Sequence, residues 1–399
     1  MTAVVVIGSG FAGLWAALGA ARRLDELGIP AGTVDITVLT VRPFHDIRVR
    51  NYEMDLSACR IPLAELLDPV GVAYVATEVT AIDTAARTVT ASSGATFGYD
   101  RLVLASGSRV LRPDVPGLRE FGFDVDTHDG ALTLQRHLRG LADDRPPPAA
   151  ATAVVVGAGL TGVETACNLP TRLRALFPRG GVAPRVVLID RSPVVGSDMG
   201  ASARPVIEQA FRDNGVETRT GVSVASVCER GVTLSSGELL EAATVVWCAG
   251  MRSSSLTEQL PVARDRLGRV AVDDYLRVIG VPAVFAAGDV AAARMDDEHL
   301  SVMSCQHGRP MGRYAGYNVI SDLFDEPMLA LQIPWYVTVL DLGPAGAVYT
   351  EGWDRVVVST GAAAKATKRT INTRRIYPPL TGNRGDLLAA AAPELQSRP

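Results

Sequence analysis

The chain of 399 residues is poor in cysteine, and its few cysteines are scattered. None forms a CxxC pair with another, and their number is odd. Such a set is poor material for a disulfide framework, so we expect a protein of the reducing cytoplasm. The five are Cys59, Cys167, Cys228, Cys248 and Cys305.

The chain also lacks an excess of basic charge and a long apolar run. Its 39 Lys and Arg residues against 43 Asp and Glu leave a net charge of −4, so no surplus of cations is available for phosphates, and we expect no nucleic-acid partner. No apolar run reaches the ~20 residues of a membrane-spanning helix, and the first residues enter a strand without a signal segment. We expect no transmembrane segment; peripheral contact with the inner face of a membrane stays open.

What the chain does have is apolar residues: 47% are hydrophobic and 21% are charged. This balance fits an α/β protein with parallel sheets, whose strands are buried on both faces and therefore form unbroken Val, Ile and Leu runs. The length favours two or three domains over a single core.

Two glycine-rich turns follow apolar strands and open helices. Residues 4–7 lead into GSGFAG and a helix predicted over 14–27, and residues 153–156 lead into GAGLTG and a helix predicted from Val163. In this pattern the first glycine makes the turn, the second lets a pyrophosphate approach, and the third lets helix and strand pack. We therefore predict two Rossmann-like dinucleotide sites at the helix N-termini. Their residues are Gly8, Gly10, Phe11, Ala12 and Gly13 in one unit and Gly157, Gly159, Leu160, Thr161 and Gly162 in the other.

An acidic residue at the end of the second strand of such a unit binds the adenosine ribose. In the second unit Asp190 follows the strand 185–189, which favours NADH, while the adjacent Arg191 leaves NADPH open as an alternative. In the first unit the same place holds Thr40, which can hydrogen-bond a ribose more weakly.

The run VPAVFAAGD predicts a buried strand over 281–287 that ends in Gly288 and Asp289, ahead of a helix. A carboxylate at such a helix start can accept the hydroxyls of a ribityl chain, while free N–H groups face a flavin. The alternative is a simple N-cap aspartate. The two upstream dinucleotide turns favour the cofactor role, and with it FAD.

Each half closes with a strand and a turn of small residues, at 101–107 and at 244–250. Small antiparallel excursions are predicted over 73–82 and 88–96 in one half and over 218–240 in the other. We predict an FAD-binding domain of residues 1–112 and 251–330, an NAD(H)-binding domain of 113–250, and a small α+β C-terminal domain of 331–399. Short strands are expected there at 335–340, 347–349 and 355–358.

The order GSGFAG, LVLASGS, GAGLTGVE, VVWCAG and VFAAGDV resembles the FAD/NAD(P)-binding pyridine nucleotide-disulfide oxidoreductase superfamily of two-dinucleotide-binding-domain flavoproteins. Within it the chain is most similar to type II NADH dehydrogenases (NADH:quinone oxidoreductases), over about residues 3–330. Three details carry the likeness: the GVE ending at Glu164, the insert 171–184, and SCQHG at 304–308, where that family has its AQxAxQ quinone motif.

The resemblance implies an enzyme that transfers hydride from NADH to FAD and then electrons to a small quinone-like acceptor. Glu164 is the candidate for positioning the nicotinamide or relaying a proton, with a buried structural carboxylate as the equal alternative. Gln306 and His307 are the candidates at the acceptor, where His307 could supply a proton or be structural. Further cofactor contacts are expected from Val79, Ala105, Ser106, Gly107 and Gly250. We expect no metal, and a homodimer through the tail is what the family implies.

Some residues depart from the family pattern. Pro310 stands where the motif has its second glutamine, and the tail has no clearly amphipathic apolar helix. Its basic residues could touch an anionic surface, although a solvated basic face is favoured: Lys365, Lys368, Arg369, Arg374 and Arg375.

Three other functions stay open from the residues. Cys167 and Cys305 are the candidates for the distant cysteine pair of a sulfide:quinone reductase. A ferredoxin or rubredoxin reductase would pass electrons to a small iron–sulfur protein. A flavin-based redox sensor or binding module would have no turnover.

Overall fold

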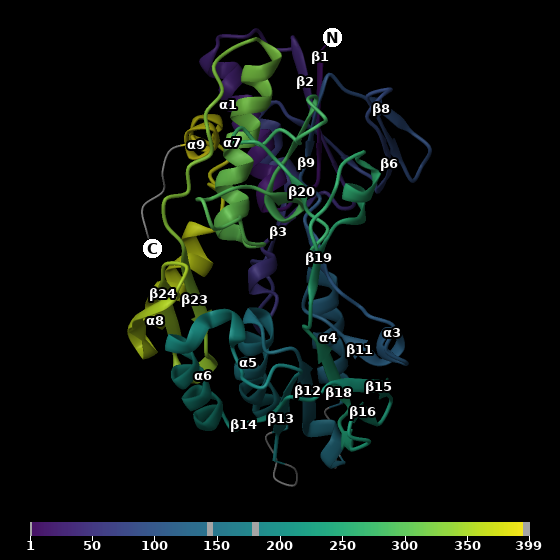
Figure 1. Ribbon diagram of the computed structural model, residues 1–399, viewed down its shortest axis with the longest axis vertical. Coiled ribbons are helices and arrows are strands. Elements are labelled where there is room, and N and C mark those ends of the chain that lie inside the picture. The colour runs from purple at the N-terminus through teal and green to yellow at the C-terminus, as the bar shows by residue number, and fades with distance from the viewer. Residues whose placement is uncertain (1, 142–146, 178–182, 394–399) are drawn as a thin grey trace.

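The computed structural model describes residues 2–141, 147–177 and 183–393. Two parallel sheets lie one above the other along the long axis of the molecule, and the C-terminal strands and helix α8 lie beside both (Figure 1). This arrangement confirms the α/β class with two dinucleotide-binding units and a small third part.

The first sheet has five strands in the order β21-β9-β1-β2-β5, all parallel. Helix α1 (Phe11–Glu26) packs against α7 (Cys305–Leu323) so closely that a Cβ at Gly312 would lie 2.3 Å from the Ala12 carbonyl oxygen. The strands are β21 (Val284–Ala286), β9 (Arg101–Leu104), β1 (Thr2–Ile7), β2 (Val34–Thr40) and β5 (Ala73–Ala76).

The second sheet repeats this plan in the order β11-β18-β12-β13-β14. The equivalence extends to single hydrogen bonds, since Gly8 N donates to Leu39 O and Gly157 N donates to Ile189 O, both at 2.8 Å. The strands are β11 (Gly122–Phe123), β18 (Thr244–Trp247), β12 (Thr152–Val156), β13 (Arg185–Asp190) and β14 (Val216–Thr220), with helices α4 (His128–Gly140), α5 (Leu160–Leu176) and α6 (Gly200–Asn214).

Both dinucleotide helices begin earlier than the sequence predicted. α1 begins at Phe11 and α5 at Leu160, so the third glycine of each turn, Gly13 or Gly162, already lies inside its helix. The reason is packing: a Cβ at Gly13 would lie 1.9 Å from the Gly8 carbonyl oxygen, so only glycine lets the first helical turn lie on the strand end.

The antiparallel excursions are shorter than predicted. β5 pairs in parallel with β2 and is an edge strand of the first sheet. In the same way β14 pairs in parallel with β13 and is an edge strand of the second sheet. The excursions proper are three-stranded sheets that follow these edge strands: β6 (Val79–Asp83), β7 (Thr88–Ala91) and β8 (Thr96–Gly98) in one unit, and β15 (Val224–Cys228), β16 (Gly231–Leu234) and β17 (Leu239–Glu241) in the other.

Short elements complete the two units. β10, which comes just before the second unit in the chain, pairs antiparallel with β19, which comes just after that unit. Their bounds, with those of the remaining short elements, are β10 (Ser108–Val110), β19 (Met251–Ser253), β3 (Phe44–Asp46), β4 (Arg60–Pro62), α2 (Leu63–Leu67), α3 (Leu118–Phe121), β20 (Val270–Ala271) and β22 (Ala291–Ala292).

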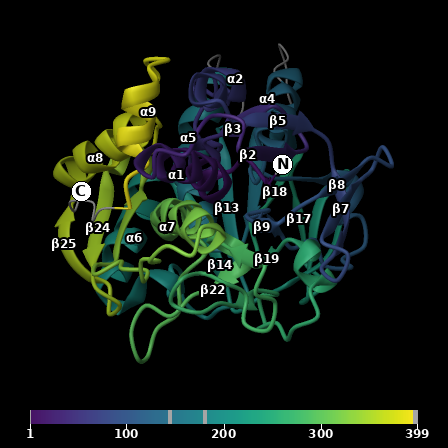
Figure 2. The same cartoon turned by 90° about the horizontal axis from the view of Figure 1, so that it is seen from above.

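The C-terminal part is the α+β unit that the sequence predicted. Strands β23 (Val337–Asp341), β24 (Ala347–Glu351) and β25 (Val356–Thr360) form an antiparallel sheet, and α8 (Gly361–Thr370) covers it before a π-helical turn (Ile371–Arg375) and α9 (Arg384–Ala390). Seen from above, α9 lies beside α1 (Figure 2).

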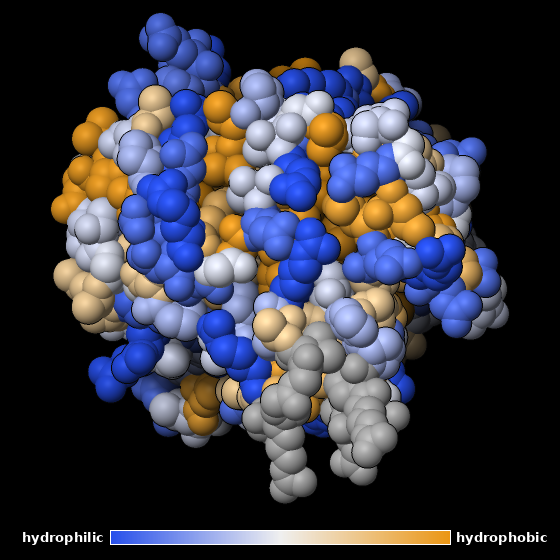
Figure 3. Space-filling view, turned by 90° about the horizontal axis from the view of Figure 1, so that it is seen from below, coloured by the Kyte–Doolittle hydropathy of each residue, from blue (hydrophilic) through white to orange (hydrophobic). Residues whose placement is uncertain are grey.

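No helix in the described ranges is long and apolar enough to cross a membrane. At the end of the molecule formed by the second unit, hydrophilic residues interrupt the hydrophobic ones over the surface (Figure 3). Of the insert 171–184, residues 178–182 lie outside the described residues.

Candidate functional site

A cavity of about 1630 Å³ lies where the carboxyl ends of both parallel sheets meet the C-terminal strands. Ligand pockets in this type of fold lie outside the carboxyl ends of the strands, and one small ligand fills roughly 300–1,000 Å³. Both glycine turns open into this one space, which therefore has room for two ligands end to end. The residues predicted for the site that line it are Gly10, Phe11, Ala12, Ala105, Gly107, Gly157, Gly159, Leu160, Thr161, Glu164, Asp190, Gly250, Gly288, Asp289 and Gln306.

The first turn fits a pyrophosphate. Gly8 has φ +105°, and a Cβ there would lie 2.4 Å from the Ala105 carbonyl oxygen, so the turn excludes any side chain. At Gly10 a Cβ would meet nothing within 4 Å, so this position is open toward the cavity. No side chain caps α1, which leaves its first N–H groups for an anion.

The second turn has the same form and adds a carboxylate. Asp190 accepts hydrogen bonds from Ala158 N at 2.5 Å and Ser192 N at 2.6 Å, so it is held at the mouth of the turn. Asp198 lies on the opposite side, and a Cβ at Gly159 would lie 3.3 Å from its Oδ2. The helix α5 that begins here also has no side-chain cap.

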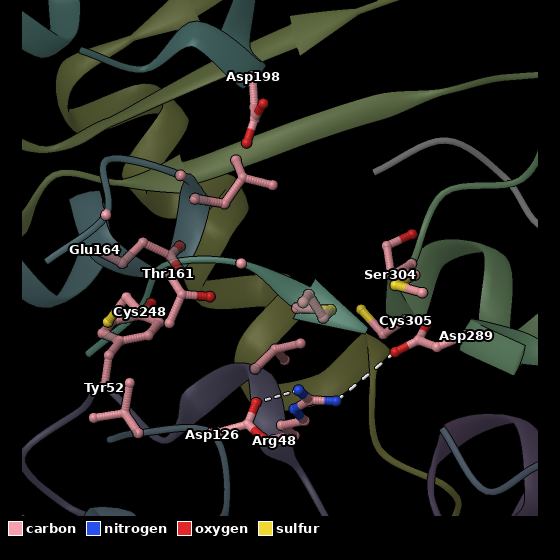
Figure 4. A pocket seen from close by; sticks show the side chains of 18 of the residues that line it. Arg48, Tyr52, Asp126, Thr161, Glu164, Asp198, Cys248, Asp289, Ser304 and Cys305 are labelled. Atoms are coloured by element: carbon pink, nitrogen blue, oxygen red, sulfur yellow. Dashed lines mark hydrogen bonds and ion pairs between the residues drawn. The ribbon is translucent and has the colours of Figure 1, made fainter. Parts of the chain in front are cut away.

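Asp289 lies in a charged network that the sequence did not predict (Figure 4). Its Oδ2 accepts from Ser108 Oγ at 2.5 Å and lies 3.7 Å from Arg48 Nη1, while Arg48 Nη2 pairs with Asp126. Burial raises the pKa of Asp289, and Arg48 and the Ser108 hydroxyl oppose that rise. Asp289 thus lines the cavity with Arg48 beside it, and its contact with a ribityl chain stays a prediction.

The helix expected directly after Asp289 is absent, and that prediction was wrong. Gly288–Val290 forms a single 3-10 turn that runs into β22, and the next α-helix, α7, begins at Cys305. The helix N-terminus near this part of the cavity is therefore that of α7, capped by Ser304, whose hydroxyl accepts from His307 N at 3.4 Å.

Glu164 is buried and paired. Its Oε1 lies 2.8 Å from Lys368 Nζ and accepts from Asp341 N at 3.1 Å. Burial raises the pKa of Glu164, and the Lys368 ammonium opposes the rise. Burial opposes the charge on Lys368, but the Glu164 and Asp341 carboxylates outweigh it and raise the pKa of the ammonium.

The predicted basic face of the tail is thus wrong for two of its five residues. Lys368 lies 9% exposed against Glu164, and Lys365 Nζ lies 2.6 Å from Asp341 Oδ2. Arg369 and Arg374 are exposed, as a solvated face requires, and Arg375 is exposed but also lines the cavity.

Gln306 lines the cavity, and its amide joins α7 to the C-terminal strands. Its Nε2 donates to Trp335 O at 3.2 Å, and its Oε1 accepts from Val337 N at 3.4 Å. His307 does not line the cavity: it is 1% exposed, its Nδ1 accepts from Val302 N at 3.3 Å, and burial lowers its pKa to about 4. This geometry favours the structural alternative for His307, because the ring does not line the cavity and a histidine with that pKa is uncharged near neutral pH, without the imidazolium proton that a general acid donates.

Three more predicted contacts lie outside the cavity lining. Thr40 Oγ1 shares a hydrogen bond of 2.8 Å with Ser9 Oγ, and Val79 packs in the core with 8% exposure. Ser106 Oγ is buried and has no hydrogen-bond partner among the described residues. Three predicted glycines also do not line the cavity, although their close backbone contacts allow the two turns to form: Gly8, Gly13 and Gly162.

A model of the pyridine nucleotide-disulphide oxidoreductase family matches residues 2–312. The chain belongs to this family. It is 78% identical, over 400 aligned positions that cover 100% of both chains, to an NADH dehydrogenase-like protein of Mycobacterium tuberculosis. It is 27% identical to a type II NADH:quinone oxidoreductase of Staphylococcus saprophyticus, over 94% of this chain and 95% of that one. Its fold is similar to that of NDH2 from Plasmodium falciparum, solved in complex with NADH, with a TM-score of 0.77, 13% identity, and coverage of 98% and 97%.

Membership makes the chain a pyridine nucleotide oxidoreductase with FAD and NAD(H) as its cofactors, which confirms the enzyme class and the cofactors expected from the motifs. Because the family consists of oxidoreductases, the alternative of a flavin-based redox sensor without turnover is not favoured. The cysteine pair of the sulfide:quinone reductase alternative is not brought together at the cavity, since Cys305 lines it and Cys167 does not. Burial also raises the pKa of Cys167 to about 12, which keeps that thiol protonated and unreactive.

Among the cavity residues that sequence reasoning did not assign to the site are Arg48, Tyr52 and Lys368. For Lys368 a usable signal existed, because Ala364 and Lys368 are four residues apart and share the buried face of α8. For Arg48 and Tyr52 no spacing in the sequence points to the cavity.

Proposed function

We propose that this protein oxidises NADH at FAD and passes the electrons to a quinone. The observation that carries the proposal is the single cavity, which extends from one glycine turn to the other and on to a third wall at Gln306 and Trp335. We assign FAD to residues 1–112 and 251–330, NADH to 113–250, and the acceptor wall to α7 with 331–399. The type II NADH:quinone oxidoreductase among the relatives supports a quinone.

The residues of the two turns act by placement. Bound FAD supplies the redox chemistry, accepting hydride and releasing electrons. The N–H groups at the start of α1 and α5 hold the two pyrophosphates, and Asp190 accepts the adenosine ribose hydroxyls of NADH. Asp289 accepts hydroxyls of the FAD ribityl chain. Because all four contacts come from strand ends or from the turns that directly follow strands, the two cofactors are held with little freedom relative to each other.

Arg48 carries the positive charge of the FAD side of the cavity. It is held on both sides, by Asp126 and by the Ser108 carbonyl oxygen at 3.1 Å. A fixed guanidinium stabilises negative charge that develops near it without reorganising. We assign Arg48 to the FAD side of the cavity, where its guanidinium would stabilise negative charge at the bound cofactor.

Lys368 supplies the proton that quinone reduction needs, and Glu164 holds its ammonium in place. Both line the cavity, and Lys368 Nζ can donate a proton to an acceptor oxygen and recover one from solvent. Gln306 holds the acceptor wall in place through its bonds to Trp335 and Val337. It is thus a positioning residue whose loss should affect the acceptor reaction more than the NADH reaction.

The test is a stopped-flow experiment on the purified yellow protein. Anaerobic NADH should bleach the flavin, and a short-chain quinone should restore the colour. Gln306→Ala should slow the second phase and leave the first unchanged. Bleaching with no recolouring by quinone would refute the quinone and favour a small iron–sulfur protein as the acceptor.

A further inference from the structure

The acceptor wall contains a partly buried arginine, Arg309, that lacks a counter-charge among the described residues. Arg309 lies one helical turn after Gln306 on the same face of α7, and both line the cavity. Its guanidinium carbon lies 5.4 Å from the centroid of the Trp15 ring. Its Nε is buried without a hydrogen-bond partner, and within residues 2–141, 147–177 and 183–393 it forms no ion pair.

The surroundings of Arg309 add positive charge instead of cancelling it. Burial lowers the pKa of Arg309 and Arg375 lowers it further, opposed only by the Cys305 thiol; no carboxylate contributes. Arg375 lines the same cavity from the π-helical turn Ile371–Arg375. Such turns are rare and are frequent at functional sites. By contrast, two other cations that line the cavity are paired: Arg48 with Asp126 and Lys368 with Glu164.

A buried guanidinium without a partner is costly unless a ligand supplies the opposite charge. Its planar fork of N–H donors suits an oxyanion with two neighbouring oxygens. Beside it the cavity wall is apolar and aromatic, with Trp335, Tyr336 and Ile376. Together these features fit a flat ring that carries an ionised oxygen at its edge.

We propose that the acceptor of this enzyme is an anionic quinone, one with an ionised hydroxyl or carboxylate on its ring, and that Arg309 binds that group. This inference rests on the proposed quinone reductase function. Arg309 thereby selects among quinones, whereas Gln306 and Lys368 serve any of them.

The experiment compares 2-hydroxy-1,4-naphthoquinone, whose hydroxyl is ionised at neutral pH, with its neutral 2-methoxy ether. Each is titrated into the oxidised FAD-loaded protein, and Kd is measured from the change in flavin absorbance. The unsubstituted protein should bind the hydroxyquinone more tightly. Arg309→Met should weaken that binding about 10-fold or more and leave the ether unchanged, because one charge-assisted contact is lost. Arg309→Lys should retain part of the preference.

Arg374→Met is the matched control, since Arg374 is exposed on the π-helical turn that also carries Arg375 and does not line the cavity. It removes the same net charge and should leave both Kd values unchanged. Equal Kd values for the two quinones, or an equal loss of both in Arg309→Met, would refute the proposal.

Two further readouts distinguish an acceptor site at Arg309 from a flavin site and from a structural role. If Arg309 served the FAD pyrophosphate instead, Arg309→Met would lose flavin on gel filtration, which would refute the proposal. The melting temperature of Arg309→Met should not fall, because an unpaired buried charge is removed. If the hydroxyquinone binds selectively yet neither quinone reoxidises the reduced enzyme, the proposed function fails and the anion site stands.

Discussion

The buried pair of Lys368 and Glu164 gives the sharpest test of how the C-terminal part is held to the NADH-binding unit. Lys368 Nζ lies 2.8 Å from Glu164 Oε1, and the two side chains are 11% and 10% exposed. Lys368→Met keeps the length of the side chain and leaves Glu164 buried without its cation. Removal of one partner of a buried pair costs about 3–5 kcal/mol, so the free energy of unfolding should fall by about that amount near neutral pH.

The size of this loss should depend on pH. Burial already raises the pKa of Glu164, and the Lys368 ammonium opposes that rise, so Lys368→Met should raise the pKa further. An acid whose pKa is higher in the folded state contributes stability below its unfolded pKa and loses it as the pH rises toward the folded pKa. The variant should therefore lose up to about 1.4 kcal/mol per pH unit across that window, and be less stable at a pH above the window than at a pH below it.

The assay is urea unfolding of the FAD-loaded protein at these two pH values, followed by far-UV circular dichroism. Glu164→Gln combined with Lys368→Met removes both charges, so the double variant should regain part of the lost stability and lose the extra pH dependence. If the single and double variants unfold alike at both pH values, Glu164 is not the group left uncompensated, and the reasoning from the buried pair is wrong.

The other predictions concern the cofactor turns. Gly8→Ala should yield protein with little bound FAD, because its Cβ would lie 2.4 Å from the Ala105 carbonyl oxygen; the ratio of flavin to protein absorbance after gel filtration measures this. Asp190→Ser should raise the KM for NADH about 10-fold and the KM for NADPH less, so unchanged selectivity would contradict the ribose contact. Asp198→Asn should lower the Kd for NADH, because its carboxylate lies beside the pyrophosphate turn; a weaker binding in equilibrium titration would contradict this.

The cofactor half of the site could be predicted from the sequence because its signals are local. A glycine turn, the strand before it and the acid at the end of the next strand lie close together in the chain, and each has one physical reason. The structure therefore brings Gly10, Gly159, Asp190 and Asp289 to one cavity. The errors of the sequence predictions are also local: α1 and α5 begin earlier than predicted, within the glycine turns, and no α-helix directly follows Asp289.

The rest could not be predicted because its contacts join distant segments. Arg48 meets Asp126 across 78 residues, and Lys368 meets Glu164 from another part of the fold. In the sequence Lys368 is one of the five basic residues named in the tail, and apart from its spacing from Ala364 only the packing of α8 separates it from the solvated ones. His307 shows the converse, since a motif position suggested chemistry and burial gave it a structural role.

The division between the two halves of the cavity also explains how an acceptor can change while the cofactors do not. The acceptor wall is built from the start of α7 and from residues 335–340 and 368–376, and Gln306 ties these segments together. Arg309 lines that wall and belongs to neither glycine turn. A shared fold and shared cofactors therefore do not fix the acceptor. We propose that the charge of the wall selects it, which is why the comparison of a charged with a neutral quinone tests this enzyme more sharply than turnover with any one quinone.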